Sequence, residues 1–205
     1  MKSYGHLTVI CGPMFSGKTT ELLKRILWAK NGQHRSIRVY KASFDVRYKK
    51  FSLVSHEGLS APAEAISEWY GVDENVEAVF FDEVQFFDKP HYLGKNIVEV
   101  IEGLLENNID VVASGLDMDW QGKPFNIVAQ LMAMAEDVYK IRGICAVCGR
   151  PSTRSYKKTQ SGESVELGTT DLYEPRCTHH WASPEDESQL TFNFDTDNPK
   201  DIIIN

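Results

Sequence analysis

The chain has 205 residues, which suits one ordinary domain or one domain with a small addition. Hydrophobic residues make up 42% of it, so a sizeable core can form, and no apolar run approaches the roughly 18 residues of a membrane span. The formal net charge of −7 argues against a general affinity for nucleic acid, which requires a basic face, yet allows a local nucleotide site. Because the first residues lack the apolar stretch of a signal peptide, we expect a cytoplasmic protein.

The first feature along the chain is a phosphate-binding pattern, GxxxxGK[ST], at residues 12–19. An apolar run at 7–11 precedes it and a helical pattern at 20–30 follows it, which is the strand–loop–helix context that the pattern requires. The backbone N–H groups of such a loop and the N-terminus of its helix attract phosphate oxygens. The predicted phosphate-binding residues are Gly12, Pro13, Met14, Phe15, Ser16, Gly17, Lys18 and Thr19.

Two side chains of this loop have separate tasks. Lys18 would reach the β- and γ-phosphates as a point charge, and the Thr19 hydroxyl would be a ligand of Mg²⁺. The alternative, a glycine-rich turn with an exposed lysine, does not account for the strand before the loop and the helix after it. The sequence therefore predicts a protein that binds a nucleoside triphosphate.

A basic and aromatic segment, residues 44–50, follows a short strand predicted at 37–40. It stands at the carboxyl end of that strand, and this edge of an open parallel sheet is where ligands bind. Arg47 can therefore contact phosphate or lie in a solvated loop, and both interpretations stay open; for Lys49 and Lys50 we expect a solvated loop. A helix is then predicted near residues 61–70.

The second motif is a mostly apolar run at 76–81 that ends in Asp82 and Glu83. A strand buried on both faces is continuously apolar. This one would carry the Asp82 carboxylate to the phosphate-binding loop, where it can hold Mg²⁺ directly or through water. Glu83 leaves the backbone in a different direction and is available for another task. It can accept the proton of a substrate hydroxyl, or it can activate water as in an ATPase.

Helices predicted at 92–106 and 127–135 alternate with strands at 109–114 and 137–144. This alternation predicts an α/β fold with a P-loop NTPase-like, doubly wound, mostly parallel sheet. The loop at 118–125 is rich in aromatic and turn-forming residues, and we expect it to pack against a flat ligand.

A second module begins with Cys145 and Cys148, and Cys177 and His180 repeat their spacing. Paired knuckles of this kind indicate a zinc site with these four residues as ligands. Four ligands fill a tetrahedral Zn²⁺, so the predicted site is structural and not catalytic. His179 is the alternative fourth ligand, and a redox pair is the alternative for the first two cysteines.

We expect three parts in the chain. These are a nucleotide-binding α/β domain at 1–144, a zinc-ribbon domain at 145–181, and an acidic tail at 182–205 that is mobile or loosely docked. Within the zinc-ribbon domain, residues 152–158 and 163–167 alternate like the two strands of a hairpin.

Four stretches resemble, in order and spacing, the type II thymidine kinases: GPMFSGKTTEL, DEVQFF, GLDMDWQGKPF, and the two knuckles with Tyr173 before the second. The resemblance covers about residues 7–181. It implies an enzyme of nucleoside salvage that transfers the γ-phosphate of ATP to the 5′-hydroxyl of thymidine or deoxyuridine. It also implies Mg²⁺ with ATP, structural Zn²⁺, a homotetramer, and feedback inhibition by thymidine triphosphate. We expect neither nucleic acid nor a membrane as a partner.

The resemblance also implies roles for single residues. Glu83 matches the general base, Asp82 matches the magnesium ligand, and Arg47 and Gln85 match positions on the phosphate side. A lasso loop at about 164–173, held at its base by zinc, would enclose the pyrimidine. The residues expected around the base are Met14, Leu116, Trp120, Phe125 and Tyr173, with Ser164, Val165, Glu166, Leu167 and Gly168 of the lasso. Trp120 departs from a frequent phenylalanine of the family, and His180 from a frequent fourth cysteine.

Three other functions stay open at this point. They are a kinase for another nucleoside or nucleotide, a nucleic-acid motor that uses the same Asp-Glu pair, and a zinc-ribbon regulatory module that uses ATP as a switch. A motor would need a basic track, which this short acidic chain does not suggest.

Overall fold

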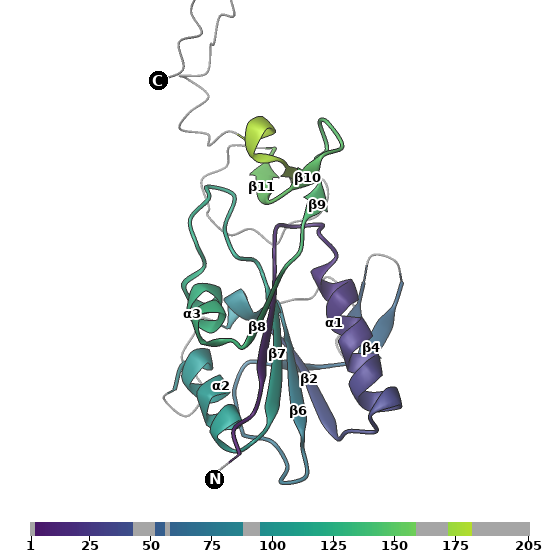
Figure 1. Ribbon diagram of the computed structural model, residues 1–205, viewed down its shortest axis with the longest axis vertical. Coiled ribbons are helices and arrows are strands. Elements are labelled where there is room, and N and C mark those ends of the chain that lie inside the picture. The colour runs from purple at the N-terminus through teal and green to yellow at the C-terminus, as the bar shows by residue number, and fades with distance from the viewer. Residues whose placement is uncertain (1–2, 43–51, 56–57, 88–94, 159–171, 182–205) are drawn as a thin grey trace, which may run out of the picture.

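The computed structural model describes residues 3–42, 52–55, 58–87, 95–158 and 172–181. Its centre is a six-stranded sheet in which each described pair of neighbouring strands is parallel (Figure 1). From one edge to the other, the strands are β5 (Glu64–Ile66), β2 (Ile37–Ala42), β6 (Ala78–Asp82), β7 (Asp110–Gly115), β1 (Leu7–Cys11) and β8 (Asp137–Lys140). The predicted α/β fold with a mostly parallel sheet is confirmed.

Helices cover both faces of this sheet (Figure 1). One face carries α1 (Lys18–Leu27), which continues into the π-helical turn η1 (Trp28–Gly32); the other carries α2 (Ile97–Glu106) and α3 (Asn126–Met134). Side chains of a strand point alternately to the two faces. In β6, Phe80 accordingly packs with α1, and Phe81 packs in the larger core with α2 and α3. The sheet is therefore doubly wound, as predicted.

The helix predicted near residues 61–70 is wrong. The chain there forms β4 (Ser60–Pro62), which pairs antiparallel with β3 (Ser52–Val54), and then β5. Ala61 and Ala63 are buried whereas Pro62 between them is exposed, and this period of two is typical of a strand. Pro62 also lacks the backbone N–H that the interior of a helix needs.

Three predicted boundaries also change. Helix α1 begins at Lys18, two residues before the predicted start. Helix α2 begins at Ile97 and not at 92, because Asn96 and Glu99 form a capping box that starts the helix there. The strand predicted at 137–144 is two strands: β8 ends at Lys140, and β9 (Gly143–Ile144) pairs with β10 (Pro151–Ser152) outside the sheet.

Residues 143–158 and 172–181 form a small unit, the ribbon module, beyond the carboxyl edge of the sheet (Figure 1). Strands β9 and β10 are one antiparallel pair, β11 (Arg154–Lys157) and β12 (Tyr173–Arg176) are another, and a short 3-10 helix, η3 (Thr178–His180), follows. The described partner of β11 is β12, whereas residues 163–167, predicted to pair with this segment, lie outside the described residues.

The division into domains at 1–144, 145–181 and 182–205 stays a prediction, and the last of these segments lies outside the described residues. Among the helices that the structure describes, none is both long and apolar enough to cross a membrane.

Candidate active site

The phosphate-binding loop leaves β1 at the carboxyl edge of the sheet and depends on two glycines. Gly12 has a φ of 147°, and a Cβ at this position would lie 2.2 Å from the carbonyl oxygen of Ile141. Gly17 has a φ of 85°, in the left-handed region that favours glycine. Together they turn the chain so that α1 starts directly at Lys18.

Lys18 lies inside this loop. The residue is only 7% exposed, and its Nζ donates a hydrogen bond to the carbonyl oxygen of Pro13 at 2.8 Å. Burial lowers the pKa of Lys18, and the negative charges of Glu83, Asp82 and Asp117 oppose that shift. The loop thus holds a cation that can neutralise a phosphate, with carboxylates within electrostatic range.

Thr19, in the first turn of α1, comes close to Asp82 at the end of β6. Strand β7 lies between β6 and β1, the strand from which the phosphate-binding loop leaves. The Thr19 hydroxyl donates to Asp82 Oδ2 at 3.4 Å, so the first turn of α1 makes the contact across the end of β7. Adjacent oxygen ligands of an octahedral Mg²⁺ lie about 3 Å apart, so a small adjustment brings these two atoms to ligand spacing. The pair therefore fits a magnesium ion that is bound with a nucleotide.

Glu83 occupies an uncommon backbone conformation for a glutamate, with φ 53° and ψ 46°. A non-glycine residue in the left-handed region is uncommon, and such residues often lie at functional sites. The peptide groups after it close the 3-10 turn η2 (Val84–Phe86), in which the Phe86 N–H donates to the Glu83 carbonyl at 3.0 Å. The Glu83 carboxylate accepts a hydrogen bond from Gln85 Nε2 at 2.6 Å. Backbone and side chain are thus both held at the end of β6.

Strand β11 joins three residues that were predicted to enclose the base. Ser155 accepts a hydrogen bond from the backbone N–H of Met14 at 3.0 Å. Lys157 stands opposite Tyr173 in the β11–β12 pair, and its Nζ lies 5.4 Å from the ring centre of Trp120. Met14, Trp120 and Tyr173 therefore gather around one strand of the ribbon module, and their role in enclosing a nucleobase stays a prediction.

The other two predicted base-pocket residues lie on the sheet side. Leu116 follows β7 directly, and its N–H donates to Gln85 Oε1 at 3.0 Å. Phe125 precedes α3 and packs partly against the core that α2 and α3 cover. The remaining predicted site residues, namely Arg47, Ser164, Val165, Glu166, Leu167 and Gly168, lie outside the described residues.

Sequence reasoning missed several residues of this site. Ser155 and Lys157 lie in a segment that was read only as half of a hairpin, although its alternation places both on the buried face of β11. Asp117 was not selected either. Its carboxylate is almost fully buried, and Lys140 Nζ lies 2.8 Å from it.

The predicted metal ligands Cys145, Cys148, Cys177 and His180 converge, with their ligand atoms all within 4.8 Å of one another. The Sγ atoms of Cys148 and Cys177 are 3.8 Å apart, which is too long for a disulfide bond of about 2.05 Å. Tetrahedral Zn²⁺ with Zn–S bonds of about 2.3 Å would space two sulfurs by about 3.8 Å. His180 directs Nδ1 to the cluster, at 3.2 Å from Cys177 Sγ and 3.8 Å from Cys145 Sγ. These four residues can therefore hold a metal ion, with His180 and not His179 as the fourth.

Trp181 connects this cluster to the loop at 118–125. It follows His180 directly, and its indole Nε1–H donates to the carbonyl oxygen of Trp120 at 3.2 Å. A Cβ at Gly122 would lie 3.0 Å from the Trp181 ring, so the ring rests on the backbone of this loop. The loop is built on the Asp119 carboxylate, which accepts from the N–H groups of Gln121 and Lys123 at 2.9 Å each. Trp181 thus links the four predicted metal ligands to the loop that carries Trp120.

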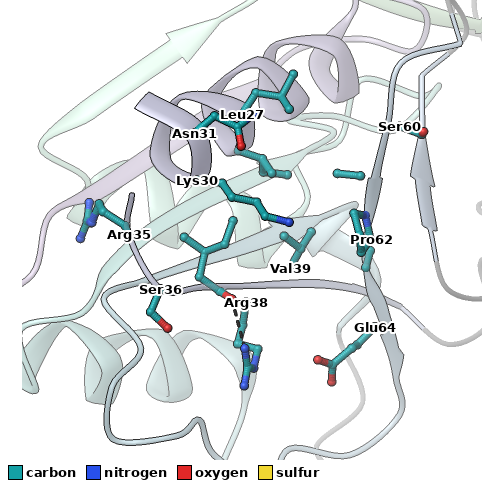
Figure 2. A pocket seen from close by; sticks show the side chains of 14 residues that line it. Leu27, Lys30, Asn31, Arg35, Ser36, Arg38, Val39, Ser60, Pro62 and Glu64 are labelled. Atoms are coloured by element: carbon teal, nitrogen blue, oxygen red, sulfur yellow. Dashed lines mark hydrogen bonds between the residues drawn. The ribbon is translucent and has the colours of Figure 1, made fainter. Parts of the chain in front are cut away.

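A cavity of about 610 Å³ lies elsewhere, between the end of α1 and β4 (Figure 2). The cations around it include Arg35 and Arg38, which pair with Asp110 and Asp73 respectively. No described residue predicted to bind substrate lines this cavity.

Comparisons with known proteins extend over both the sheet and the ribbon module. The family model described as thymidine kinase matches residues 5–181. A thymidine kinase from Bdellovibrio bacteriovorus is 36% identical over 194 residues, which cover 93% of this chain and 92% of that protein. The matched span contains the phosphate-binding loop, the Asp-Glu pair and all four residues of the metal cluster.

Proposed function

The chain belongs to the thymidine kinase family, and we propose that it transfers the γ-phosphate of ATP to the 5′-hydroxyl of thymidine or deoxyuridine. The observation that carries this proposal is the position of Glu83, directly after Asp82 at the end of β6. Asp82 reaches Thr19, and Thr19 follows Lys18 in the phosphate-binding loop. A carboxylate available as a base therefore lies next to the groups that would hold the phosphates.

The loop and Lys18 would bind ATP. Phosphoryl transfer asks a protein mainly for positioning and for neutralisation of charge on the transferred group. Gly12 to Thr19 supply backbone N–H groups, the N-terminus of α1 and the Lys18 ammonium for this purpose. Mg²⁺, held by Thr19 and Asp82 together with ATP, would add its charge at the phosphate oxygens. Arg47 is proposed as a further phosphate contact, from the family resemblance alone.

Glu83 would accept the proton of the 5′-hydroxyl as the oxygen attacks the γ-phosphorus. The O–H bond breaks, the new P–O bond forms, and ADP leaves with the electrons of the old P–O bond. The hydrogen bond from Gln85 and the backbone turn at Glu83 fix this carboxylate before substrate arrives. A fixed base avoids the loss of rate that misplacement causes.

The nucleoside base would bind between the end of β7, the loop at 118–125 and the ribbon module. Leu116, Trp120 and Tyr173 supply apolar surface there, and the lasso residues 164–168 are proposed to supply backbone groups for the edge of the base. Thymine presents acceptor, donor and acceptor along its pairing edge, whereas cytosine replaces one acceptor with a donor. An unpaired buried polar group costs about 1–3 kcal/mol, so we expect deoxycytidine and purine nucleosides to be poor substrates.

Zn²⁺ in the Cys₃His cluster would have a structural role, because four protein ligands fill its tetrahedral shell. A cytoplasmic homotetramer with feedback inhibition by thymidine triphosphate is proposed from the family resemblance. A separate zinc-ribbon domain at 145–181 is proposed from the spacing of the ligands.

An assay with ATP and a panel of nucleosides tests the proposed function. Purified protein should convert thymidine and deoxyuridine to their 5′-monophosphates and leave deoxycytidine largely unchanged. The Tyr173→Phe variant should keep this ranking, since the ring and not the hydroxyl would pack on the substrate. Equal rates for deoxycytidine and thymidine would replace the proposal with a broad-specificity kinase. Rapid ATP hydrolysis without any acceptor would refute nucleoside phosphorylation.

A further inference from the structure

Gln85 joins the two sides of the site through one side-chain amide. Its Nε2 donates to Glu83 Oε2 at 2.6 Å, and its Oε1 accepts from the Leu116 N–H at 3.0 Å. The Leu116 N–H can only donate, so Oε1 must face Leu116 and Nε2 must face the Glu83 carboxylate. Both contacts therefore agree on a single orientation of the amide.

The packing around Gln85 leaves its amide little freedom. The residue is only 3% exposed. A Cβ at Gly115 would lie 2.6 Å from Gln85 Oε1, so the missing side chain at this position makes room for the amide. The same Cβ would lie 3.0 Å from Val84 and 3.1 Å from Val128, so the gap is bounded by apolar side chains. A buried amide that makes a hydrogen bond at each end is a stiff connection.

We propose that Gln85 is the positioning residue of the reaction, holding the Glu83 carboxylate in place by anchoring it to the end of β7 at Leu116. This inference rests on the proposed function, in which Glu83 is the general base. It also gives Gln85 a task different from the phosphate contact that the family resemblance suggested. Gln85 acts through Glu83. It connects the Glu83 carboxylate to Leu116, a residue expected to line the nucleoside pocket.

The chain offers a substitution that separates the two hydrogen bonds. Gln85→Glu has nearly the same shape and keeps an oxygen for the Leu116 N–H. It replaces the donor that faces Glu83 with a carboxylate oxygen, so the hydrogen bond to the Glu83 carboxylate is lost and a negative charge is added beside it. Gln85→Met has a similar length and removes both contacts. Gln130→Glu, on the exposed side of α3, makes the same chemical change away from the site and is the control.

The experiment measures transfer to thymidine for these variants, alone and combined with Glu83→Gln, in single-turnover reactions with enzyme in excess. We expect Gln85→Glu to lower the rate of transfer about 10²-fold, because a misplaced catalytic group has an effect of this size. The KM for thymidine should change by less than about threefold, and Gln130→Glu should match the wild type. In the Glu83→Gln background, Gln85→Glu should cause no further loss, since a residue that acts through Glu83 has nothing left to position.

Two results would overturn the inference. One is a normal rate for Gln85→Glu, which would show that only the Leu116 contact matters. The other is a loss that multiplies with that of Glu83→Gln, which would indicate an independent or purely structural role. If Gln85→Glu does not fold, as judged by circular dichroism, the same cycle with Gln85→Met decides between these outcomes. Wild-type protein that fails to phosphorylate thymidine would refute the proposed function, and that result is distinct from either of these.

Discussion

The sheet and the ribbon module meet at one site but are stabilised in different ways. Every residue of β1 and β6 is buried, and two apolar cores cover the two faces of the sheet. Each buried aliphatic or aromatic side chain contributes about 1.5–3 kcal/mol, and this contribution does not depend on a metal ion. In the described part of the ribbon module, the buried hydrophobic residues are Cys145, Tyr173 and Cys177. Two of these three are predicted metal ligands.

This difference indicates a division of tasks. The sheet positions Lys18, Asp82 and Glu83, the groups proposed to handle phosphate and the proton. The ribbon module positions Tyr173 and, through Trp181, supports the loop that carries Trp120. Substitution of these sheet residues should therefore lower the rate of phosphoryl transfer. Loss of the metal ion should instead lower the affinity for the nucleoside.

The largest effect is expected for Lys18→Ala. Removal of a preorganised charge at the phosphates should lower kcat by about 10³-fold or more. The fold should remain, because burial disfavours the charged form of Lys18 and the side chain contributes little to either core. Steady-state kinetics and the melting temperature check this, with Lys30→Ala on the exposed turn η1 as the control. Near-normal turnover by Lys18→Ala would contradict the proposed role of the phosphate-binding loop in phosphoryl transfer.

Glu83→Gln should lower the rate of transfer by roughly 10²–10⁴-fold, the usual size of a general-base contribution. The side chain keeps its shape, so ATP and thymidine should bind nearly as in the wild type. Single-turnover kinetics and equilibrium binding check both parts. A variant that loses thymidine binding while transfer stays fast would assign Glu83 to binding and not to proton transfer.

These two predictions rest on residues that local sequence patterns identify, and the structure confirms the strands that precede them. Residues 7–11 were predicted as a strand, and β1 spans Leu7–Cys11. The loop and the Asp-Glu pair each follow a strand directly, so a local pattern is enough to find them. The helix predicted near 61–70 is wrong because Pro62 lacks the N–H that a helix interior needs, and the segment pairs as a strand instead. Met14 and Ser155 are in contact although they lie 141 positions apart in the sequence. The hydrophobic periodicity within a single helix or strand cannot predict a contact over such a distance.

A smaller, local effect is expected for Cys177→Ser. Loss of one ligand should reduce bound zinc well below one ion per chain and speed amide exchange in β11 and β12 roughly 10²-fold, with β1 and β6 unchanged. Cys11→Ala is the matched control, since burial in the sheet, followed by the charge of Asp117, raises the pKa of Cys11 to about 11 and keeps it a neutral thiol. Full zinc occupancy in Cys177→Ser would contradict the assigned ligand set.

The smallest effect is expected for Trp181→Ala. It removes the hydrogen bond to the Trp120 carbonyl and the ring that rests on Gly122, so the loop at 118–125 should loosen. The KM for thymidine should rise about fivefold, the equivalent of one hydrogen bond of about 1 kcal/mol, with kcat nearly unchanged. Trp28→Ala is the control, since Trp28 lies on η1 and is 56% exposed. A fall in kcat with constant KM would show that Trp181 affects phosphoryl transfer and not nucleoside binding.

The division of tasks is tested most directly by calorimetric binding of ATP and of thymidine before and after a chelator removes the metal. We predict that the Kd for ATP changes by less than about threefold, because none of the residues proposed to bind ATP is a predicted zinc ligand, while thymidine affinity falls by about 10-fold or more. Restored zinc should restore thymidine binding. Equal losses for both ligands, or no loss for either, would contradict the claim that the sheet binds the phosphates and the metal-stabilised module encloses the nucleoside.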